Sequence, residues 1–398
     1  MADRDFLQNH FDHHDREFMK DPYPGYAEMR ARCPVTWSDR HGGFWVLTSY
    51  EDVYRAFRDA ETFSNGIATI PNSGHGERRF PLIQNDPPQH QKYRAIVQPW
   101  FSTQRVAALE PNMRRRSIEL VDEFIEKGRC DLFKDFARRL PADMIADIMG
   151  VPRADKDRFE DWARRITEDR DVDPEGAARA YTEMTAYYGA LLQSRRQSPR
   201  DDLPSVLVNA TIDGRPLGDE ELVLYCILIE NAGFDTTSTF IGTALWWLAN
   251  HPEHRRQLID DPALIPSGVD ELLRYLAPAS PARLLRHDTE IRGRDLHEGE
   301  QSLLVIPSAN RDPAQFADPE EVRFDRRPNR HLAFGTGIHR CLGMYLAESE
   351  SRIALEEVLR RLPDYRVCGE VTWSNGQKFG VRSLPVTFTP GKRELATV

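Results

Sequence analysis

The sequence has little cysteine and no long apolar run. Its five cysteines, at positions 33, 130, 226, 341 and 368, are odd in number and irregularly spaced, which excludes a disulfide framework. None of them forms a C-x-x-C pair, so the usual structural zinc motif is absent. The longest apolar runs, at 222–229 and 240–249, are too short to span a membrane, and the charged N-terminus does not resemble a signal peptide. We therefore expect a cytoplasmic protein without a membrane anchor.

The charge of the chain is predominantly negative. Its 63 acidic and 53 basic residues give a net charge of −10, so the few basic clusters, such as the one at 113–116, lie within an acidic whole. This balance argues against nucleic acid as a partner. The 398 residues contain no linker-like segment, and we expect one domain over 1–398.

Helical periodicity dominates the apolar pattern. Apolar residues recur at helical spacing in five segments, at 22–33, 50–59, 107–128, 141–150 and 354–362. Strand-like segments are short, and the best are at 42–49, 302–307 and 383–390. The pattern predicts a mainly α fold with small β-sheets.

Two long segments are rich in turn residues. The segment 64–88 also carries five apolar residues, Ile67, Ile70, Phe80, Leu82 and Ile83, which is typical of a lid over an apolar site. The segment 310–331 is a meander rich in proline and aspartate, and it leads directly into a glycine-rich stretch with one cysteine.

The longest predicted helix runs from an N-cap at Asp219 to Asn250, a length of about 48 Å. Its middle, "ENAGFDTTSTF" at 230–240, holds Gly233 and four hydroxyl residues, which are poor choices for a buried helix. Thr236 can donate its hydroxyl hydrogen to the carbonyl of Ala232 and so open the helix locally. The helix propensity of these residues is low although the surrounding pattern predicts a helix, and such a conflict indicates a functional site.

Cys341 lies just before a second helix, where free backbone N–H groups and the helix dipole favour a thiolate. Gly335, Gly337 and Gly343 surround it and suit sharp backbone turns or the close approach of a flat group. Three interpretations stay open: an inert structural cysteine, a nucleophile with His339 as its base, and a thiolate ligand to haem iron. A dinucleotide-binding fingerprint is excluded because Arg340 stands where its third glycine is needed.

The stretch "FGTGIHRCLG" at 334–343 resembles the haem-binding signature of the cytochrome P450 family. Three further elements match in the family's order: "AGFDTT" at 232–237, "ELLR" at 271–274, and "ANRDP" with "HLAFG" at 309–313 and 331–335. The resemblance is strongest to the soluble bacterial branch that includes camphor hydroxylase, and it covers nearly the whole chain.

The resemblance implies the P450 fold, with haem b held between the long central helix and the cysteine loop. Cys341 would be the axial thiolate ligand of the iron. The residues expected to contact the haem are Ala232, Gly233, Phe334, Gly335 and Gly343, and those expected to hold its propionates are His90, Arg94, Arg283 and His339.

The resemblance also implies catalytic and structural pairs. Asp235 and Thr236 match the family's acid–alcohol pair, which delivers protons during oxygen activation. Glu271 and Arg274 match a buried ion pair, which we expect Arg326 or Arg327 to complete.

The expected reaction is insertion of one oxygen atom of O2 into a C–H bond of a small apolar substrate such as a terpenoid, steroid, fatty acid or aromatic. Four residues are expected to line the substrate pocket: Phe80, Ile83, Phe234 and Ala279. Arg78 and Arg79 in the lid are candidates to contact an oxygenated substrate. Two alternatives stay open, a peroxygenase that uses H2O2 and a haem-binding sensor without catalytic activity.

The chain shows no flavin or nicotinamide domain, so we expect electrons from a separate ferredoxin and its NAD(P)H-dependent reductase. An acidic ferredoxin needs a basic docking face. The candidate cations are Lys92, Arg105, Arg114, Arg115 and Arg340.

Overall fold

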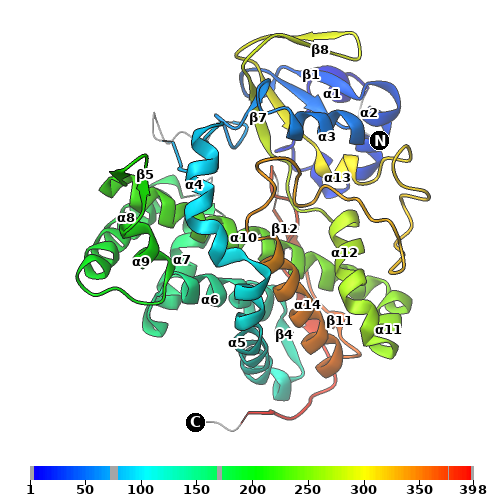
Figure 1. Ribbon diagram of the computed structural model, residues 1–398. Helices are drawn as coiled ribbons and strands as arrows, with labels where there is room; N and C mark the ends of the chain where they lie inside the picture. Colours follow the sequence, from blue (N-terminus) through cyan, green and yellow to red (C-terminus); the bar gives the residue numbers. More distant parts are fainter. Residues whose placement is uncertain (1–3, 72–78, 168–172, 375, 396–398) are drawn as a thin grey trace.

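The computed structural model describes residues 4–71, 79–167, 173–374 and 376–395. The predicted fold class is confirmed, since helices form the body and short strands form small sheets at its margin (Figure 1). The helices are α1 (Arg4–Asn9), α2 (Tyr23–Arg32), α3 (Tyr50–Arg58), α4 (Gln89–Val97), α5 (Thr103–Asp122), α6 (Arg139–Ile148), α7 (Lys156–Thr167), α8 (Pro174–Gln197), α9 (Leu203–Val208), α10 (Asp219–Asn250), α11 (Pro252–Asp260), α12 (Ile265–Tyr275), α13 (Ile306–Ala309) and α14 (Met344–Arg361). The strands are β1 (Val35–Ser38), β2 (Phe44–Leu47), β3 (Phe63–Ser64), β4 (Arg129–Asp131), β5 (Thr211–Ile212), β6 (Arg215–Pro216), β7 (Ala282–Leu285), β8 (Thr289–Ile291), β9 (Arg294–Leu296), β10 (Gln301–Leu304), β11 (Arg366–Val367), β12 (Thr372–Trp373), β13 (Val381–Ser383) and β14 (Pro385–Thr387).

Helix α10 passes through the middle of the molecule, with α6, α8 and α14 packed along it (Figure 1). Its 32 residues match the predicted span, but Gly218 is the N-cap and Asp219 is the first helical residue. The difference arises because Glu221, and not Asp219, turns back to accept a hydrogen bond from the Gly218 backbone N–H at 3.0 Å. Most of its residues are buried, whereas Ala232 in its middle is exposed. This exposed point marks the place where the helix faces the candidate site.

The largest sheet has five strands in the order β1-β2-β10-β7-β3 and lies on one side of the helical body with α1, α2 and α3 (Figure 1). Strand β10 pairs in parallel with β2 and antiparallel with β7, so it joins segments far apart in the chain. Two of the predicted strand segments, at 42–49 and 302–307, supply β2 and β10. Strand β7 of this sheet carries Arg283, which is 4% exposed.

Helix α14 packs along α5 and also contacts α10 and α12. The apolar face of α14, including Ile353, Leu355 and Val358, is buried in the main hydrophobic core. This packing fixes the start of α14 and therefore the loop that carries Cys341. Among the residues described by the structure, no helix is both long and apolar enough to cross a membrane.

Candidate active site

The loop before α14 is folded by its glycines. Gly335 and Gly337 adopt φ values of +62° and +72°, in the left-handed region that favours glycine. A Cβ at Gly337 would lie 2.5 Å from the backbone oxygen of Phe57, so a side chain cannot fit there. The backbone N–H of Cys341 donates to the carbonyl of Phe334 at 2.9 Å and closes the loop. The predicted role of these two glycines in turning the backbone is consistent with this geometry.

Cys341 lies two residues before Gly343, the N-cap of α14, as expected. The residue is exposed on one side, and protein surrounds the sulfur on the others. Burial raises the pKa of its thiol, while a backbone hydrogen bond from Gly343 and the charge of Arg94 lower it in part. The backbone N–H at the start of α14 therefore favours the thiolate, and burial opposes it. A bound metal cation would supply the missing stabilisation.

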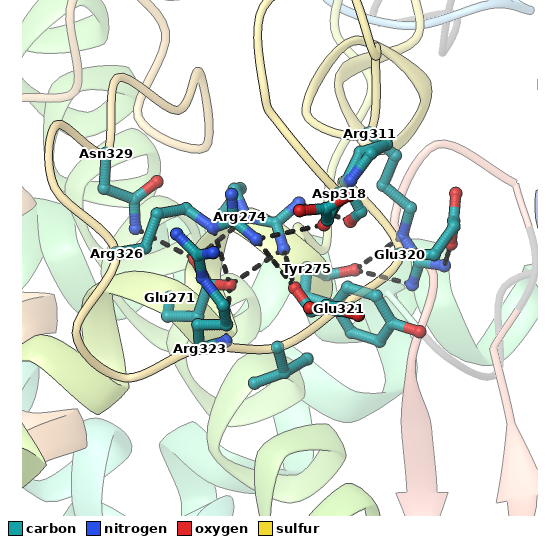
Figure 2. A network of polar contacts seen from close by, with 12 residues as sticks. Glu271, Arg274, Tyr275, Arg311, Asp318, Glu320, Glu321, Arg323, Arg326 and Asn329 are labelled. Atoms are coloured by element: carbon teal, nitrogen blue, oxygen red, sulfur yellow. Dashed lines mark hydrogen bonds and ion pairs between the residues drawn. The ribbon is translucent and has the colours of Figure 1, made fainter.

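The meander 310–331 is fixed to α12 by a buried network of charges (Figure 2). Glu271 and Arg274 form the predicted ion pair, with both guanidinium contacts at 2.8–2.9 Å and both side chains almost completely buried. Arg326 completes the network by donating to Glu271 Oε1 at 3.0 Å, whereas Arg327 is exposed. The network anchors the segment directly preceding the cysteine loop.

A cluster of basic side chains lies beside the loop. His90 and His339 have ring centroids 4.0 Å apart, and His90 comes from α4, which also carries Arg94. Burial and the charge of Arg94 lower the pKa of His90 to about 4. Burial and the charges of His90, Arg283 and Arg94 lower the pKa of His339 to about 2. Burial also lowers the pKa of Arg283 to about 10.

The members of this cluster lack acidic partners within the described part of the chain. Both ring nitrogens of His90 and the Nε2 atom of His339 are buried without a hydrogen-bond partner. Arg283 donates to the backbone oxygen of Ala282 at 2.7 Å, and neither it nor Arg94 forms an ion pair with a carboxylate of a described residue. The charge of Asp86 acts on His90 and Arg283 but forms no ion pair with either. Buried polar atoms without hydrogen-bond partners beside two arginines favour the binding of an anion.

The residues present fit haem b. The basic side chains of His90, Arg94, Arg283 and His339, which form no ion pair with a carboxylate of a described residue, suit the two carboxylates of its propionate groups. The exposed Cys341 supplies a thiolate ligand, and open space over Gly343, where a Cβ would meet nothing within 4 Å, suits the close approach of a flat ring. The described residues contain no group of three or more His, Cys, Asp or Glu side chains placed to hold a metal.

The middle of α10 supplies the polar groups expected for oxygen chemistry. The Thr236 hydroxyl donates to the carbonyl of Ala232 at 3.2 Å, as the sequence predicted. Asp235 is 1% exposed and accepts hydrogen bonds from Lys378 at 2.7 Å and Arg382 at 2.6 Å. Burial alone would raise the pKa of Asp235, but these two cations hold it well below its usual value. The carboxylate is therefore ionised and held by two cations, one of which, Lys378, has a side chain that is 38% exposed.

Gly233 has a packing role in the structure. A Cβ at this position would lie 2.8 Å from the Ile145 side chain of α6. A larger residue at 233 would therefore displace the end of the Ile145 side chain, so glycine favours the close approach of α6 to α10.

Three of the predicted pocket residues fall where they can line a site. Phe80 and Ile83 are partly buried at the edge of the main core, and Ala279 forms a β-bridge with Lys378, the partner of Asp235. Phe234 does not join them. It is 2% exposed and lines a small cavity with Ile145 of α6 and Tyr188 of α8. The prediction for Phe234 was wrong because two residues along a helix correspond to about 200° of rotation, which turns Phe234 away from the exposed Ala232.

One of the two lid arginines lies within the described residues. Arg78 lies outside the described residues, and Arg79 is exposed. Ile67, Ile70 and Leu82 are buried, so the ends of the predicted lid segment are part of the core.

Four of the five predicted docking cations already have acidic partners. Lys92 pairs with Asp213 at 2.5 Å and Arg105 with Asp201 at 2.9 Å, and both partners are distant in sequence. The remaining two pairs are those of Arg114 with Glu357 at 3.0 Å and of Arg115 with Glu119. Arg340 is exposed and has no ion-pair partner among the described residues. The predicted basic face is therefore largely neutralised, and Arg340 is its strongest member.

Sequence reasoning missed Lys378 and Arg382, the partners of Asp235. Lys378 precedes the short strand β13 and Arg382 lies within it. Single basic residues are usual on the exposed face of such a strand, so no local signal identified them. It also missed the buried pair in which the Tyr188 hydroxyl donates to Glu230 at 2.8 Å. A carboxylate within the apolar run of the central helix was the signal that could have found this pair.

Comparisons with known proteins agree with the geometry. The sequence model of the cytochrome P450 family matches residues 173–262 and 263–363. The chain is 37% identical over 375 residues to the mycinamicin IV hydroxylase/epoxidase of Micromonospora griseorubida, covering 91% of this chain and 94% of the relative. It is 35% identical over 384 residues to the steroid C26-monooxygenase of Mycolicibacterium smegmatis, covering 93% of this chain and 94% of that relative.

The fold agrees equally well with solved structures. A cytochrome P450 of Bacillus megaterium in complex with testosterone superposes with a TM-score of 0.85 at 32% identity, covering 94% of this chain and 99% of the other. The cysteine loop, the buried cation cluster and these similarities lead to one conclusion: the chain belongs to the cytochrome P450 family, is a P450 monooxygenase, and has haem b as its cofactor.

Proposed function

We propose that the chain, acting as one domain over 1–398, hydroxylates a C–H bond of an apolar substrate, with Cys341 as the ligand of haem iron. The observation that carries the proposal is the exposed Cys341 beside four basic side chains that lack acidic partners. When bound, haem supplies the activation of O2 that attacks an unactivated C–H bond. The protein supplies the thiolate, the anchoring of the propionates and a site shielded from water.

Proton delivery in this proposal depends on Asp235 and Thr236. The Asp235 carboxylate, held by Lys378 and Arg382, would pass protons from the solvent side of Lys378 toward Thr236. The Thr236 hydroxyl would leave its bond to the Ala232 carbonyl and orient the proton donor toward the reacting oxygen. This use of protons favours a reductive reaction with O2 over a peroxygenase reaction.

The proposed substrate class is an apolar molecule of the terpenoid, steroid, fatty acid or aromatic kind. Two similar proteins support it by name, a steroid C26-monooxygenase and a structure in complex with testosterone. We further propose that electrons come from a ferredoxin that contacts the exposed Arg340. An Arg340→Glu variant should be reduced more slowly than an Arg115→Glu variant, because Arg115 is already paired with Glu119.

The test of the function is the absorption spectrum of the reduced, carbon-monoxide-treated protein. We expect the red-shifted band that thiolate coordination produces, and its loss in Cys341→Ser. Cys368→Ser changes an exposed cysteine elsewhere in the chain and should retain the band. Absence of the band in the unmodified protein, or its persistence in Cys341→Ser, would refute the proposal.

A further inference from the structure

Glu230, Asn231, Asp235 and Thr236 are among the polar side chains in the middle of α10, and three of these four have partners. Asp235 is held by Lys378 and Arg382, and Glu230 accepts from the Tyr188 hydroxyl. Thr236 donates to the backbone of its own helix. The fourth is Asn231, whose Oδ1 atom is buried and has no hydrogen-bond partner in the structure. A polar atom buried in this way is unfavourable unless another molecule completes its hydrogen bond.

The position of Asn231 places it at the candidate site. It directly precedes Ala232, the exposed residue in the middle of α10, and is itself half-buried. It lies four residues before Asp235, so the two side chains project from the same side of the helix. Asp235 contacts Lys378, and Lys378 forms a β-bridge with Ala279, one of the predicted pocket residues. Asn231 therefore borders the region between α10 and the segment around Ala279.

The neighbouring Glu230 provides a contrast on the same helical turn. Its carboxyl faces α6 and α8, where it lines a small cavity together with Tyr188 and Phe234. The Glu230 side chain thus lies in packed protein, whereas Asn231 adjoins the exposed Ala232 in the chain. Of these two side chains, only that of Asn231 has a buried polar atom without a hydrogen-bond partner.

We propose that Asn231 is a specificity-determining residue that binds a hydroxyl or carbonyl oxygen of an otherwise apolar substrate. This inference rests on the proposed function and narrows its substrate class to oxygenated apolar molecules. A carboxamide both donates and accepts, so it pairs with either kind of oxygen. A substrate without that oxygen leaves the carboxamide unpaired, which is the arrangement that discriminates most strongly between close analogues.

The test uses the full-length haem protein and three matched pairs of ligands: testosterone and androstane, borneol and bornane, and 1-dodecanol and dodecane. Dissociation constants are measured from the change in haem absorption when a ligand displaces iron-bound water. The variant is Asn231→Leu, which has a similar volume and replaces an unpartnered polar atom, so it should fold and retain haem. The matched control is Glu230→Gln on the same turn.

We expect the unmodified protein to bind at least one oxygenated ligand about tenfold more tightly than its hydrocarbon, which corresponds to one buried hydrogen bond. In Asn231→Leu, weaker binding of the oxygenated ligand should reduce that preference to less than about twofold. Glu230→Gln should retain the tenfold preference. An unchanged preference in Asn231→Leu, or no preference in the unmodified protein, would overturn the inference.

The carbon monoxide spectrum separates this inference from the proposed function. A protein that shows the thiolate band but binds none of the six ligands would overturn the proposed substrate class and leave the haem–thiolate proposal intact. A protein without the band would refute the proposed function itself, whatever the ligand titrations showed.

Discussion

The ammonium group of Lys378 lies 2.7 Å from a carboxylate oxygen of Asp235, although 143 residues separate them in the chain. Arg382 contacts the other oxygen at 2.6 Å. The central helix is thereby joined to the C-terminal hairpin by a buried carboxylate with two cationic partners. Both the stability and the proposed chemistry of the protein depend on this connection.

Asp235→Asn should destabilise the protein at neutral pH. The depressed pKa of Asp235 means that its stabilising contribution is complete above its unfolded pKa of about 4 and is lost as pH falls toward the folded value. The variant should therefore lose about 3 kcal/mol of unfolding free energy at pH 7, and this difference should shrink below pH 4. Urea unfolding at pH 7 and pH 3.5 measures both effects, with the exposed Asp295→Asn as the control.

The same variant should slow turnover if Asp235 passes protons. Loss of a positioned proton-transfer group typically costs about 100-fold or more in rate. We expect substrate-dependent NAD(P)H oxidation to fall by at least this order in Asp235→Asn and its solvent deuterium isotope effect to rise. Retention of the normal rate and isotope effect would assign Asp235 a structural role only.

Glu230→Gln should stabilise the protein in alkaline solution. Burial raises the pKa of Glu230 to about 8, and the hydrogen bond from Tyr188 offsets this only in part. Because the folded pKa lies above the unfolded value, ionisation costs stability increasingly as pH rises from about 4 to 8. The variant should gain on the order of a few kcal/mol at pH 8.5 and almost nothing at pH 4, as measured by urea unfolding at the two pH values. An equal effect on stability at both pH values would contradict a raised pKa of Glu230.

Arg326→Ala should destabilise the protein and weaken haem retention, whereas Arg327→Ala should do neither. Arg326 contacts the buried Glu271, and its removal leaves that carboxylate with fewer partners, at a cost of about 3–5 kcal/mol. Arg327 is adjacent and exposed, which makes it a matched control. Thermal unfolding and the haem-to-protein absorbance ratio give the two measurements. Equal behaviour of the variants would show that the network does not support the cysteine loop.

Arg283→Met should have opposite effects on the apoprotein and the haem complex. It removes a buried cation that lacks an acidic partner, so the apoprotein should become more stable by about 1–3 kcal/mol. It also removes a propionate partner, so haem should transfer more rapidly to apomyoglobin. Arg286→Met, at an exposed position nearby, should change neither quantity appreciably.

The sequence predicts this structure well where short-range rules decide it. The loop of Gly335, Gly337 and Cys341, the span of α10 and the hydrogen bond of Thr236 all follow from local patterns. The choice between Arg326 and Arg327 does not, because it depends on how the meander folds back on α12.

The predictions from the sequence were wrong where the direction of a side chain, or a partner far away in the chain, decides the role of a residue. Phe234 was assigned to the pocket although helical rotation turns it into the core. Lys92 was taken as a free cation, but Asp213 neutralises it from a hairpin 121 residues away. Charge in a sequence shows which groups exist, and only the fold shows which of them are already paired.

The Glu271 network also determines which residues of the meander can change. Arg274 and Arg326 reach five carbonyls of this segment, at Asn310, Ala317, Asp318, Pro319 and Glu321. Carbonyl oxygens are common to all amino acids, so substitution at Ala317, Asp318, Pro319 or Glu321 leaves these acceptors in place, whereas the Asn310 side chain also accepts from the Leu332 N–H at 2.7 Å. Side chains along this stretch can therefore be exchanged while Arg274, Arg326 and Glu271 still hold its backbone, and such changes would reshape the outer surface without loosening the iron ligand.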